Sequence, residues 1–243
     1  MRVEMLNVGW MTAARGLWRQ GEAEPEKPIR LPVPAYLIET ESERILVDTG
    51  LNPNAAADRE GHYGQGPISF FALEQELPLG EQVDLGSLTK VVLTHLHFDH
   101  AGGLELIPDS VPVFIQRAEW EAGRDEAAIE RNFLLPRDYA GLGEPILVDG
   151  DHDLLGDGTV VLLSTPGHTP GHQSVQVGEL VLGIDVGLFA ESLDDLRFPS
   201  FADDFEAQRR SAERLKELRE AGHTVRPGHD PDVLQAGPVA VGD

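Results

Sequence analysis

The sequence contains no cysteine among its 243 residues. This absence excludes disulfide bonds, thiolate metal ligands and a thiol nucleophile, so any metal site must be built from His, Asp and Glu. No apolar stretch approaches the ~20 residues that a membrane-spanning helix requires. The N-terminus also lacks the long apolar segment and the small-residue cleavage site of a secretory signal. We therefore expect a cytoplasmic protein without a membrane partner.

Basic residues are also few, with 19 Lys and Arg against 42 Asp and Glu and a formal net charge of −23. A charge of this sign repels phosphate backbones, and we find no local basic patch that would offset it. We therefore expect no nucleic-acid partner. The length and the ordinary apolar share of 41% predict one domain over residues 1–243. The choice between a monomer and a homodimer stays open.

Short apolar strands alternate with polar loops along the chain. The predicted strands cover residues 2–8, 35–40, 44–47, 90–93, 160–164, 174–177, 180–184 and 224–225. One amphipathic surface helix is expected over 203–221, because apolar residues recur there at helical spacing and Gly222 follows as a stop. The segments 19–34 and 52–67 are rich in Pro, Gly and polar residues, so long loops are predicted there.

The strongest motif is the run His95-Leu96-His97-Phe98-Asp99-His100, which directly follows a predicted strand. In an extended segment alternate residues share a face, so His95, His97 and Asp99 are expected to converge while His100 points elsewhere. This arrangement suits two adjacent metal ions, with two imidazoles for one and an aspartate plus an imidazole for the other. A solvated polar loop is the alternative, and it is disfavoured because few other roles need such a cluster.

Two metal ions need more ligands than this run provides. His168, Asp185 and His229 each follow a predicted strand, and His168 lies in a Pro/Gly-rich loop that would hold its backbone rigidly. Taken singly, each residue would more often be structural or exposed, but together with the first cluster they are predicted to complete the site. Asp48, at another strand end, is expected to orient a ligand imidazole.

The order of these motifs resembles the metallo-β-lactamase superfamily over most of the chain. The resemblance rests on the histidine run, the later Pro-Gly-His, Ile184-Asp185 and Gly228-His229. It implies an α/β fold, an αββα sandwich in which helices flank two mixed β-sheets. It also implies that His172 stabilises its loop. The implied ligand sets are His95, His97 and His168 for one metal, Asp99, His100 and His229 for the other, and Asp185 as the bridge.

Within the superfamily the sequence is most similar to the N-acyl-homoserine lactonases, through the segments 34–40, 45–50, 115–120 and 165–174. This similarity implies hydrolysis of a lactone ring. Two divalent cations would lower the pKa of a shared water so that hydroxide attacks the carbonyl. Asp99 is expected to accept the proton of the nucleophile and to return it to the leaving alkoxide. Zinc is the first choice of metal, with Mn, Fe and Co as alternatives.

One position departs from the lactonase pattern. These enzymes place a tyrosine three residues after the bridging aspartate, whereas this sequence has Leu188 followed by Phe189. Losing one hydrogen-bond donor near a developing oxyanion costs about 10²-fold or more in rate. The sequence therefore does not decide which lactone is the substrate or which acyl chain it carries. Tyr63 and Tyr139 are candidates to replace the missing hydroxyl. The candidates to line an acyl channel, with plain core packing as the alternative, are Trp10, Met11, Phe70, Phe71 and Phe98.

Other activities of the superfamily fit less well. A β-lactam hydrolase is usually exported and often has a cysteine ligand, a nuclease needs a basic groove, and a persulfide dioxygenase would use one iron. The main alternative enzyme is a thioester hydrolase of the glyoxalase II kind, although the 14 residues after His229 are too few for its C-terminal helical domain. A non-catalytic lactone-binding module is the alternative from another class, and a complete ligand set disfavours it because buried polar clusters without a metal cost stability.

Overall fold

The computed structural model describes residues 1–242, and most of its strands form where short runs of Val, Ile and Leu occur. The strands of the larger sheet are β1 (Arg2–Ala14), β2 (Pro28–Glu39), β3 (Arg44–Val47), β4 (Ala72–Glu74), β5 (Lys90–Val92), β6 (Val113–Gln116), β7 (Ile146–Val148) and β13 (Gly237–Val239). The strands of the smaller sheet are β8 (His152–Asp153), β9 (Val160–Ser164), β10 (Gln173–Val177), β11 (Leu180–Leu182) and β12 (Thr224–Arg226).

Most helices are a single turn or two. They are α1 (Arg15–Trp18), α2 (Pro53–Ala57), α3 (Arg59–Tyr63), α4 (Leu79–Gln82), α5 (Phe98–Ala101), α6 (Arg117–Ala122), α7 (Glu126–Arg131), α8 (Pro136–Tyr139), α9 (Ser192–Asp195) and α10 (Phe205–Glu220). The 3₁₀ turns are η1 (Leu85–Ser87), η2 (Leu104–Leu106) and η3 (Ile184–Val186). Within residues 1–242, none of the helices combines the length and the apolar composition needed to cross a membrane.

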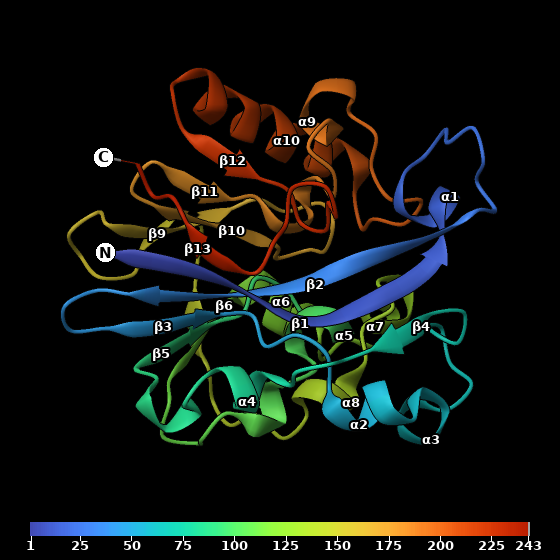
Figure 1. Cartoon of the computed structure of the whole chain (residues 1–243), viewed down its shortest axis with the longest axis horizontal. Coiled ribbons are helices and arrows are strands. Elements are labelled where there is room, and N and C mark those ends of the chain that lie inside the picture. Colours follow the sequence, from blue (N-terminus) through green and yellow to red (C-terminus); the bar gives the residue numbers. More distant parts are fainter. Residues whose placement is uncertain (243) are drawn as a thin grey trace.

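Both sheets are mixed. The larger sheet has the order β13-β1-β2-β3-β5-β6-β7, with β4 beside β1, and its strands change from antiparallel to parallel pairing at β3. The smaller sheet has the order β12-β11-β10-β9-β8 and is antiparallel except for the pair β11 and β12. The sheets face each other, with helices outside both, and the predicted αββα sandwich is therefore confirmed (Figure 1).

The central strands β3, β9 and β10 are largely buried on both faces, because successive side chains of one strand enter different apolar layers. Ile45 and Val47 pack in the layer between the sheets, while Leu46 packs outward under the helices. In the smaller sheet Leu162 likewise points inward and Leu163 outward. Strands buried on both faces read as continuous apolar runs, which is why most of them are recognisable in the sequence.

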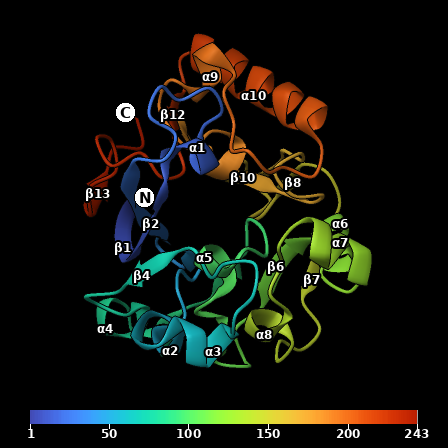
Figure 2. The ribbon, with the colours of Figure 1, turned by 90° about the vertical axis from the view of Figure 1, so that its right-hand side faces the viewer.

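Helices cover the two outer faces. The helices α9 and α10 lie over the smaller sheet, whereas α2, α3, α4 and α8 lie over the larger one (Figure 2). Asp204 caps α10 by accepting hydrogen bonds from two backbone N–H groups of its first turn, and Ala212 and Leu215 pack against the smaller sheet. The surface helix predicted over 203–221 is confirmed, although the helix itself covers only Phe205–Glu220.

The two long loops predicted at 19–34 and 52–67 are partly wrong. Residues 28–34 belong to β2, where prolines hide the strand pattern because they cannot donate ladder hydrogen bonds. Residues 53–63 form α2 and α3, and Asn52 caps α2 through hydrogen bonds from the backbone of Asn54 and Ala55, with Pro53 at the first helical position. This cap is a sequence signal that the loop prediction passed over.

Candidate metal centre

Two residues separate the end of β5 from the first residue of the histidine run, His95. The first part of the run is extended, but Phe98 starts the helical turn α5, so the extended continuation expected for Asp99 is wrong. The turn places Asp99 and His100 beside each other, with Oδ2 of Asp99 3.5 Å from Nε2 of His100. Both therefore face a second group of side chains instead of the group formed by His95 and His97.

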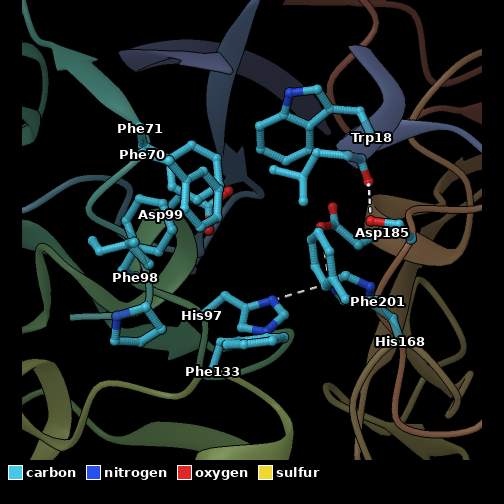
Figure 3. A pocket seen from close by; sticks show the side chains of 14 residues that line it. Trp18, Phe70, Phe71, His97, Phe98, Asp99, Phe133, His168, Asp185 and Phe201 are labelled. Atoms are coloured by element: carbon cyan, nitrogen blue, oxygen red, sulfur yellow. Dashed lines mark hydrogen bonds and ion pairs between the residues drawn. The ribbon is translucent and has the colours of Figure 1, made fainter. Parts of the chain in front are cut away.

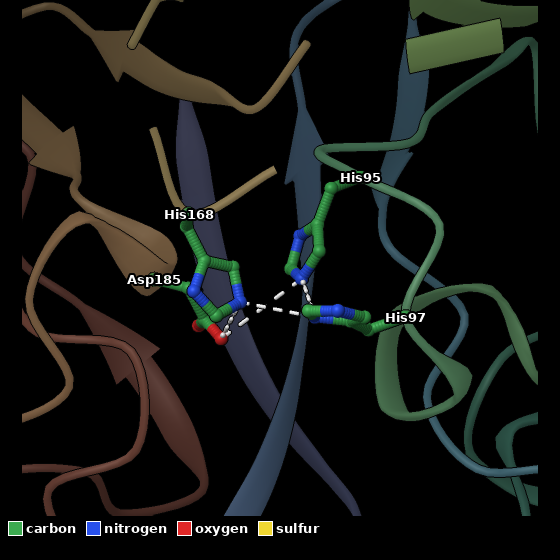
Figure 4. A group of neighbouring side chains, drawn as sticks. All are labelled: His95, His97, His168 and Asp185. Carbon is green, nitrogen blue, oxygen red and sulfur yellow. Dashed lines mark hydrogen bonds and ion pairs between the residues drawn. The ribbon is translucent and has the colours of Figure 1, made fainter. Parts of the chain in front are cut away.

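The structure brings all seven predicted ligand residues together in two groups. Within each group, ligand-type atoms lie within 4.8 Å of one another. Nδ1 of His97 is 3.0 Å from Nε2 of His95 and 3.0 Å from Nε2 of His168 (Figure 4). One group is His95, His97, His168 and Asp185, and the other is Asp99, His100 and His229. All seven side chains are buried, although they come from strand ends in both sheets.

Asp185, in η3 after β11, lies between the two groups. Its Oδ2 is 3.3 Å from Nε2 of His168, and its Oδ1 is 3.2 Å from Nε2 of His229 and 3.6 Å from Nε2 of His100. The backbone of Gly228 approaches so closely that a Cβ there would lie 2.6 Å from Oδ1 of Asp185. A glycine before His229 is therefore required for the ends of β11 and β12 to meet.

Oxygen acceptors outside the groups fix the orientation of three imidazoles. A carbonyl only accepts, so the ring nitrogen facing it carries the proton and the other nitrogen is free to face the group. The contacts are His97 Nε2 to the Asn132 carbonyl, His100 Nδ1 to Asp48 Oδ2 and His229 Nδ1 to the Pro32 carbonyl, each at 2.8 Å.

Asp48 has the orienting position that the sequence predicts, and it serves both groups. It is 1% exposed and adopts φ +60°, a conformation that aspartate tolerates better than most residues. Besides accepting from His100, its carboxylate accepts from the backbone N–H and the hydroxyl of Thr94, each at 2.8 Å. The Thr94 hydroxyl in turn lies 3.1 Å from Nδ1 of His95, so one carboxylate orients an imidazole of each group.

The electrostatics of the site suit cations. Burial alone would lower the pKa of His100, but the carboxylates of Asp99, Asp48 and Asp185 hold it well above its usual value. Burial also lowers the pKa of His229, but the carboxylates of Asp185 and then Asp99 raise it above its usual value. These carboxylates draw positive charge into the site.

Two imidazoles of the first group, those of His95 and His97, are held in the neutral form that binds metals. Burial, followed by the neighbouring imidazoles, keeps the pKa of His95 well below its usual value, and burial lowers that of His97 to about 4. Among residues 1–242, the buried Nε2 atoms of His100 and His229 and Oδ1 of Asp185 have no hydrogen-bond partner. Buried nitrogen and oxygen atoms that face one another without a hydrogen-bond partner fit two divalent cations, because His and Asp are usual ligands of such cations.

Two buried residues tie the loops of the site together. Glu119 is 0% exposed, and its carboxylate accepts from the backbone N–H groups of Leu96 at 2.9 Å and Gly171 at 2.8 Å. Sequence reasoning missed this role, because a glutamate on a short helix ordinarily faces solvent. His172 stabilises its loop as the resemblance implied, since its Nε2 accepts from the Asp185 backbone N–H at 3.2 Å and burial lowers its pKa to about 3.

An apolar pocket of about 260 Å³ opens onto the two groups (Figure 3). Of the predicted channel residues, Phe70, Phe71 and Phe98 line it. The other two predictions are wrong: Met11 is fully buried in the core, and the ring of Trp10 stacks under the guanidinium of Arg30. The aromatic residues that sequence reasoning missed are Trp18, Phe133 and Phe201, which come from segments without apolar periodicity. The polar lining includes His97, Asp99, His168 and Asp185.

The tyrosines do not replace the missing hydroxyl. Leu188 is 1% exposed and belongs to the core, and in the described part of the chain none of the tyrosines lines the pocket. The Tyr139 side chain is buried, and the Tyr63 hydroxyl donates to the two carboxylate oxygens of Asp138 at 2.8 and 3.0 Å. The prediction that the hydroxyl of Tyr63 or Tyr139 replaces the missing one is therefore wrong, because neither side chain lines the pocket.

Replacing Asp138 by Asn should stabilise the protein above neutral pH. Burial raises the pKa of the Asp138 carboxyl to about 7, whereas the unfolded chain loses that proton near pH 4. The folded state therefore binds more protons between pH 4 and 7, and its stability falls across that window. Asn retains an acceptor for Tyr63 without the charge, so we expect a gain on the order of 1–4 kcal/mol at pH 8 and little at pH 4.

Urea unfolding at both pH values measures this difference against the unmodified protein. Asp109→Asn, which removes an exposed carboxylate, should give no such pH-dependent gain. Equal stability changes at pH 4 and pH 8 for Asp138→Asn would show that folding does not raise the pKa of the Asp138 carboxyl.

Comparisons with known proteins agree with this geometry. Residues 28–229 match the family model of the metallo-beta-lactamase superfamily. The chain is 35% identical over 208 residues to an N-acyl homoserine lactonase of Bacillus thuringiensis, covering 80% of this chain and 79% of that protein. It is 31% identical over 221 residues to the N-acyl homoserine lactonase AttM of Azorhizobium caulinodans, covering 83% of each. The solved structure of an N-acyl homoserine lactone hydrolase with N-hexanoyl-L-homoserine bound at its catalytic metal center is similar at a TM-score of 0.81 and 27% identity, over 95% of this chain and 94% of that one.

Proposed function

The chain belongs to the metallo-beta-lactamase superfamily, and from this premise we propose that it is a metal-dependent lactonase that opens N-acyl homoserine lactones or a closely related lactone. The observation that carries the proposal is the position of the two His and Asp groups at an aromatic pocket. Such a pocket suits an acyl chain, and the groups beside it suit an ester carbonyl. The lactonase relatives and the product-bound lactone hydrolase structure support this substrate class.

We propose two zinc ions as the metals, although imidazole and carboxylate donors also accept Mn, Fe and Co. His95, His97 and His168 would hold one ion, Asp99, His100 and His229 the other, and Asp185 would contact both. When bound, the cations supply Lewis-acid activation of a water molecule and of the ester carbonyl. The chain orients the donors for this chemistry through Asp48, and it ties the surrounding loops together through Glu119.

Asp99 is the chain's own proton carrier in this proposal. It lines the pocket, and its Oδ2 lies 3.4 Å from Nε2 of His229 and 3.5 Å from Nε2 of His100. From this position the carboxylate takes the proton of the nucleophile and returns it to the ring oxygen that leaves. Phe71, Phe98 and Phe201 surround the same space with apolar rings, which keep bulk water away from the transfer.

The experiment that tests the function follows acid release from N-acyl homoserine lactones with a pH indicator, using zinc-loaded and metal-stripped protein. We expect the loaded protein to release acid from lactones of short and long acyl chain, and the stripped protein to lose this activity. Metal-dependent turnover would also exclude a purely lactone-binding role. Activity on a glutathione thioester but not on lactones would replace the proposal with the thioester hydrolase.

A further inference from the structure

The C-terminal turn of α7 lies beside the metal centre and has an unusual backbone. Asn132 follows the helix, and Phe133 has φ +55°, the left-handed region that glycine ordinarily takes after a helix. The backbone N–H of Leu134 donates to the carbonyl of Ile129 at 3.1 Å. This hydrogen bond is that of a Schellman motif, which ends a helix and requires a left-handed residue at the position of Phe133. A phenylalanine held in this conformation indicates that the surroundings fix the turn.

This turn holds His97 in place. The Asn132 carbonyl accepts from Nε2 of His97 at 2.8 Å, which leaves Nδ1 of the same ring 3.0 Å from Nε2 of His168. Asn132 is 3% exposed, and its side-chain Nδ2 donates to the Ala128 carbonyl at 3.0 Å and to Asp203 Oδ1 at 3.1 Å. The position of the carbonyl that orients His97 therefore depends on Asp203 as well as on the helix end.

Asp203 also reaches the other side of the first group. Its backbone N–H donates to the carbonyl of His168 at 3.1 Å, while its Oδ1 accepts from Asn132 and, at 2.8 Å, from Nε of Arg131. His97 follows β5 of the larger sheet and His168 follows β9 of the smaller one. One residue thus connects imidazoles that belong to different sheets.

Aromatic rings on the pocket side also connect the Asn132 turn with His97 and His168. The ring of Phe133 packs edge-on against Phe201 with centroids 6.0 Å apart, and Phe201 lies 6.1 Å from the ring of His97 and 5.8 Å from that of His168 (Figure 3). Phe133 is 41% exposed, so its ring gains little from burial. The polar contacts of Asn132 and Asp203 therefore hold the turn together with the buried side chain of Leu134.

We infer that Asp203 is a positioning residue which, through the Asn132 turn, fixes the distance between the imidazoles of His97 and His168 and so sets the zinc affinity of the first group. The inference rests on the proposed metal site. Both connections are indirect, because one runs through the Asn132 side chain and the other through the backbone of Asp203 itself. Contacts of this kind around metal ligands typically change metal affinity 10- to 100-fold when they are removed.

The test measures zinc affinity of the whole protein by competition with a chromophoric chelator, together with the visible spectrum of the cobalt-substituted form. Asp203→Ala should weaken zinc binding about tenfold and alter the cobalt spectrum. Asp203→Asn keeps the Oδ1 acceptor, so it should stay within about twofold of the unmodified protein. The inference is overturned by an Asp203→Ala affinity within twofold, and equally by an Asp203→Asn variant as weak as Asp203→Ala, since the charge would then be the cause.

Asn132→Ala breaks the same contact from the other side and should weaken zinc binding by a similar factor. The double variant should then be no weaker than either single one, whereas multiplied effects would show two independent contacts and overturn the inference. Arg131→Ala is the control, because the Arg131 side chain is 55% exposed and its loss leaves the Asn132–Asp203 bond in place. Since the readout is metal binding, a protein that binds zinc in this way but opens no lactone would count against the proposed function alone.

Discussion

Replacing Asp99 by Asn is expected to lower kcat for lactone opening about 10³-fold, within the range that general acid–base groups contribute. The amide keeps the size of the side chain and one oxygen, but it neither takes a proton from the nucleophile nor returns one to the leaving oxygen. Because six of the seven donor residues are untouched, part of the zinc should stay bound. The measurement is steady-state kinetics combined with metal analysis of the same preparation.

Asp138→Asn is the matched control for this variant. It makes the same change in another buried carboxylate, whose partner is Tyr63 and which does not line the pocket formed by the described residues. Its kcat should stay within a few-fold of the unmodified protein. Intact turnover in Asp99→Asn would exclude Asp99 as the proton carrier, and complete loss of zinc would reassign its importance to metal binding.

Much of the candidate centre is predictable because five of the nine histidines belong to the two groups and lie shortly after strand ends. The seven donors follow this rule, since β5, β9, β11 and β12 all end at the same edge of the sandwich. A hydrophobic strand followed by His or Asp is a local pattern, and several such patterns are explained together only by a shared site. The order of residues along the chain therefore carries information about their meeting in space.

The supports of the donors leave much weaker traces in the sequence. His97 is oriented by the backbone carbonyl of Asn132, and His229 by that of Pro32, and every residue type has such a carbonyl. Glu119 becomes a buried acceptor only because the loop of Gly171 folds against it. Such roles depend on tertiary contacts between distant segments, which composition and periodicity do not encode.

The pocket shows the same division. Phe70 and Phe71 are predictable as neighbours in a long connection, yet Trp18 and Phe201 meet there from opposite ends of the chain, with ring centroids 6.5 Å apart. Residue type alone predicts Met11 in the channel, although alternation along β1 directs its side chain into the core. Residue type alone therefore does not separate residues that line the pocket from residues of the hydrophobic core, since both are apolar.

Asp185→Asn is expected to reduce bound zinc from two equivalents to one or none and to lower lactone turnover about 10³-fold or more. Asp185 is the side chain that lies between the groups, with Oδ2 facing His168 and Oδ1 facing His229. Without its charge, two neighbouring cations would repel each other across a buried space where screening is weak. Losing the several kcal/mol that a cation contributes to the transition state corresponds to about 10³-fold in rate.

Asp230→Asn separates this effect from a general loss of buried charge. Asp230 directly follows His229 and is 5% exposed, but its carboxylate accepts from the backbone of Ala190 and Asp232 and belongs to neither group in the part of the chain described. It should keep two equivalents of zinc even if its stability falls. Metal analysis after dialysis, with calorimetric titration of the stripped proteins, gives both stoichiometries. Two tightly bound equivalents in Asp185→Asn would mean that each group holds its cation independently, because the remaining imidazoles and Asp99 would then suffice without a shared carboxylate.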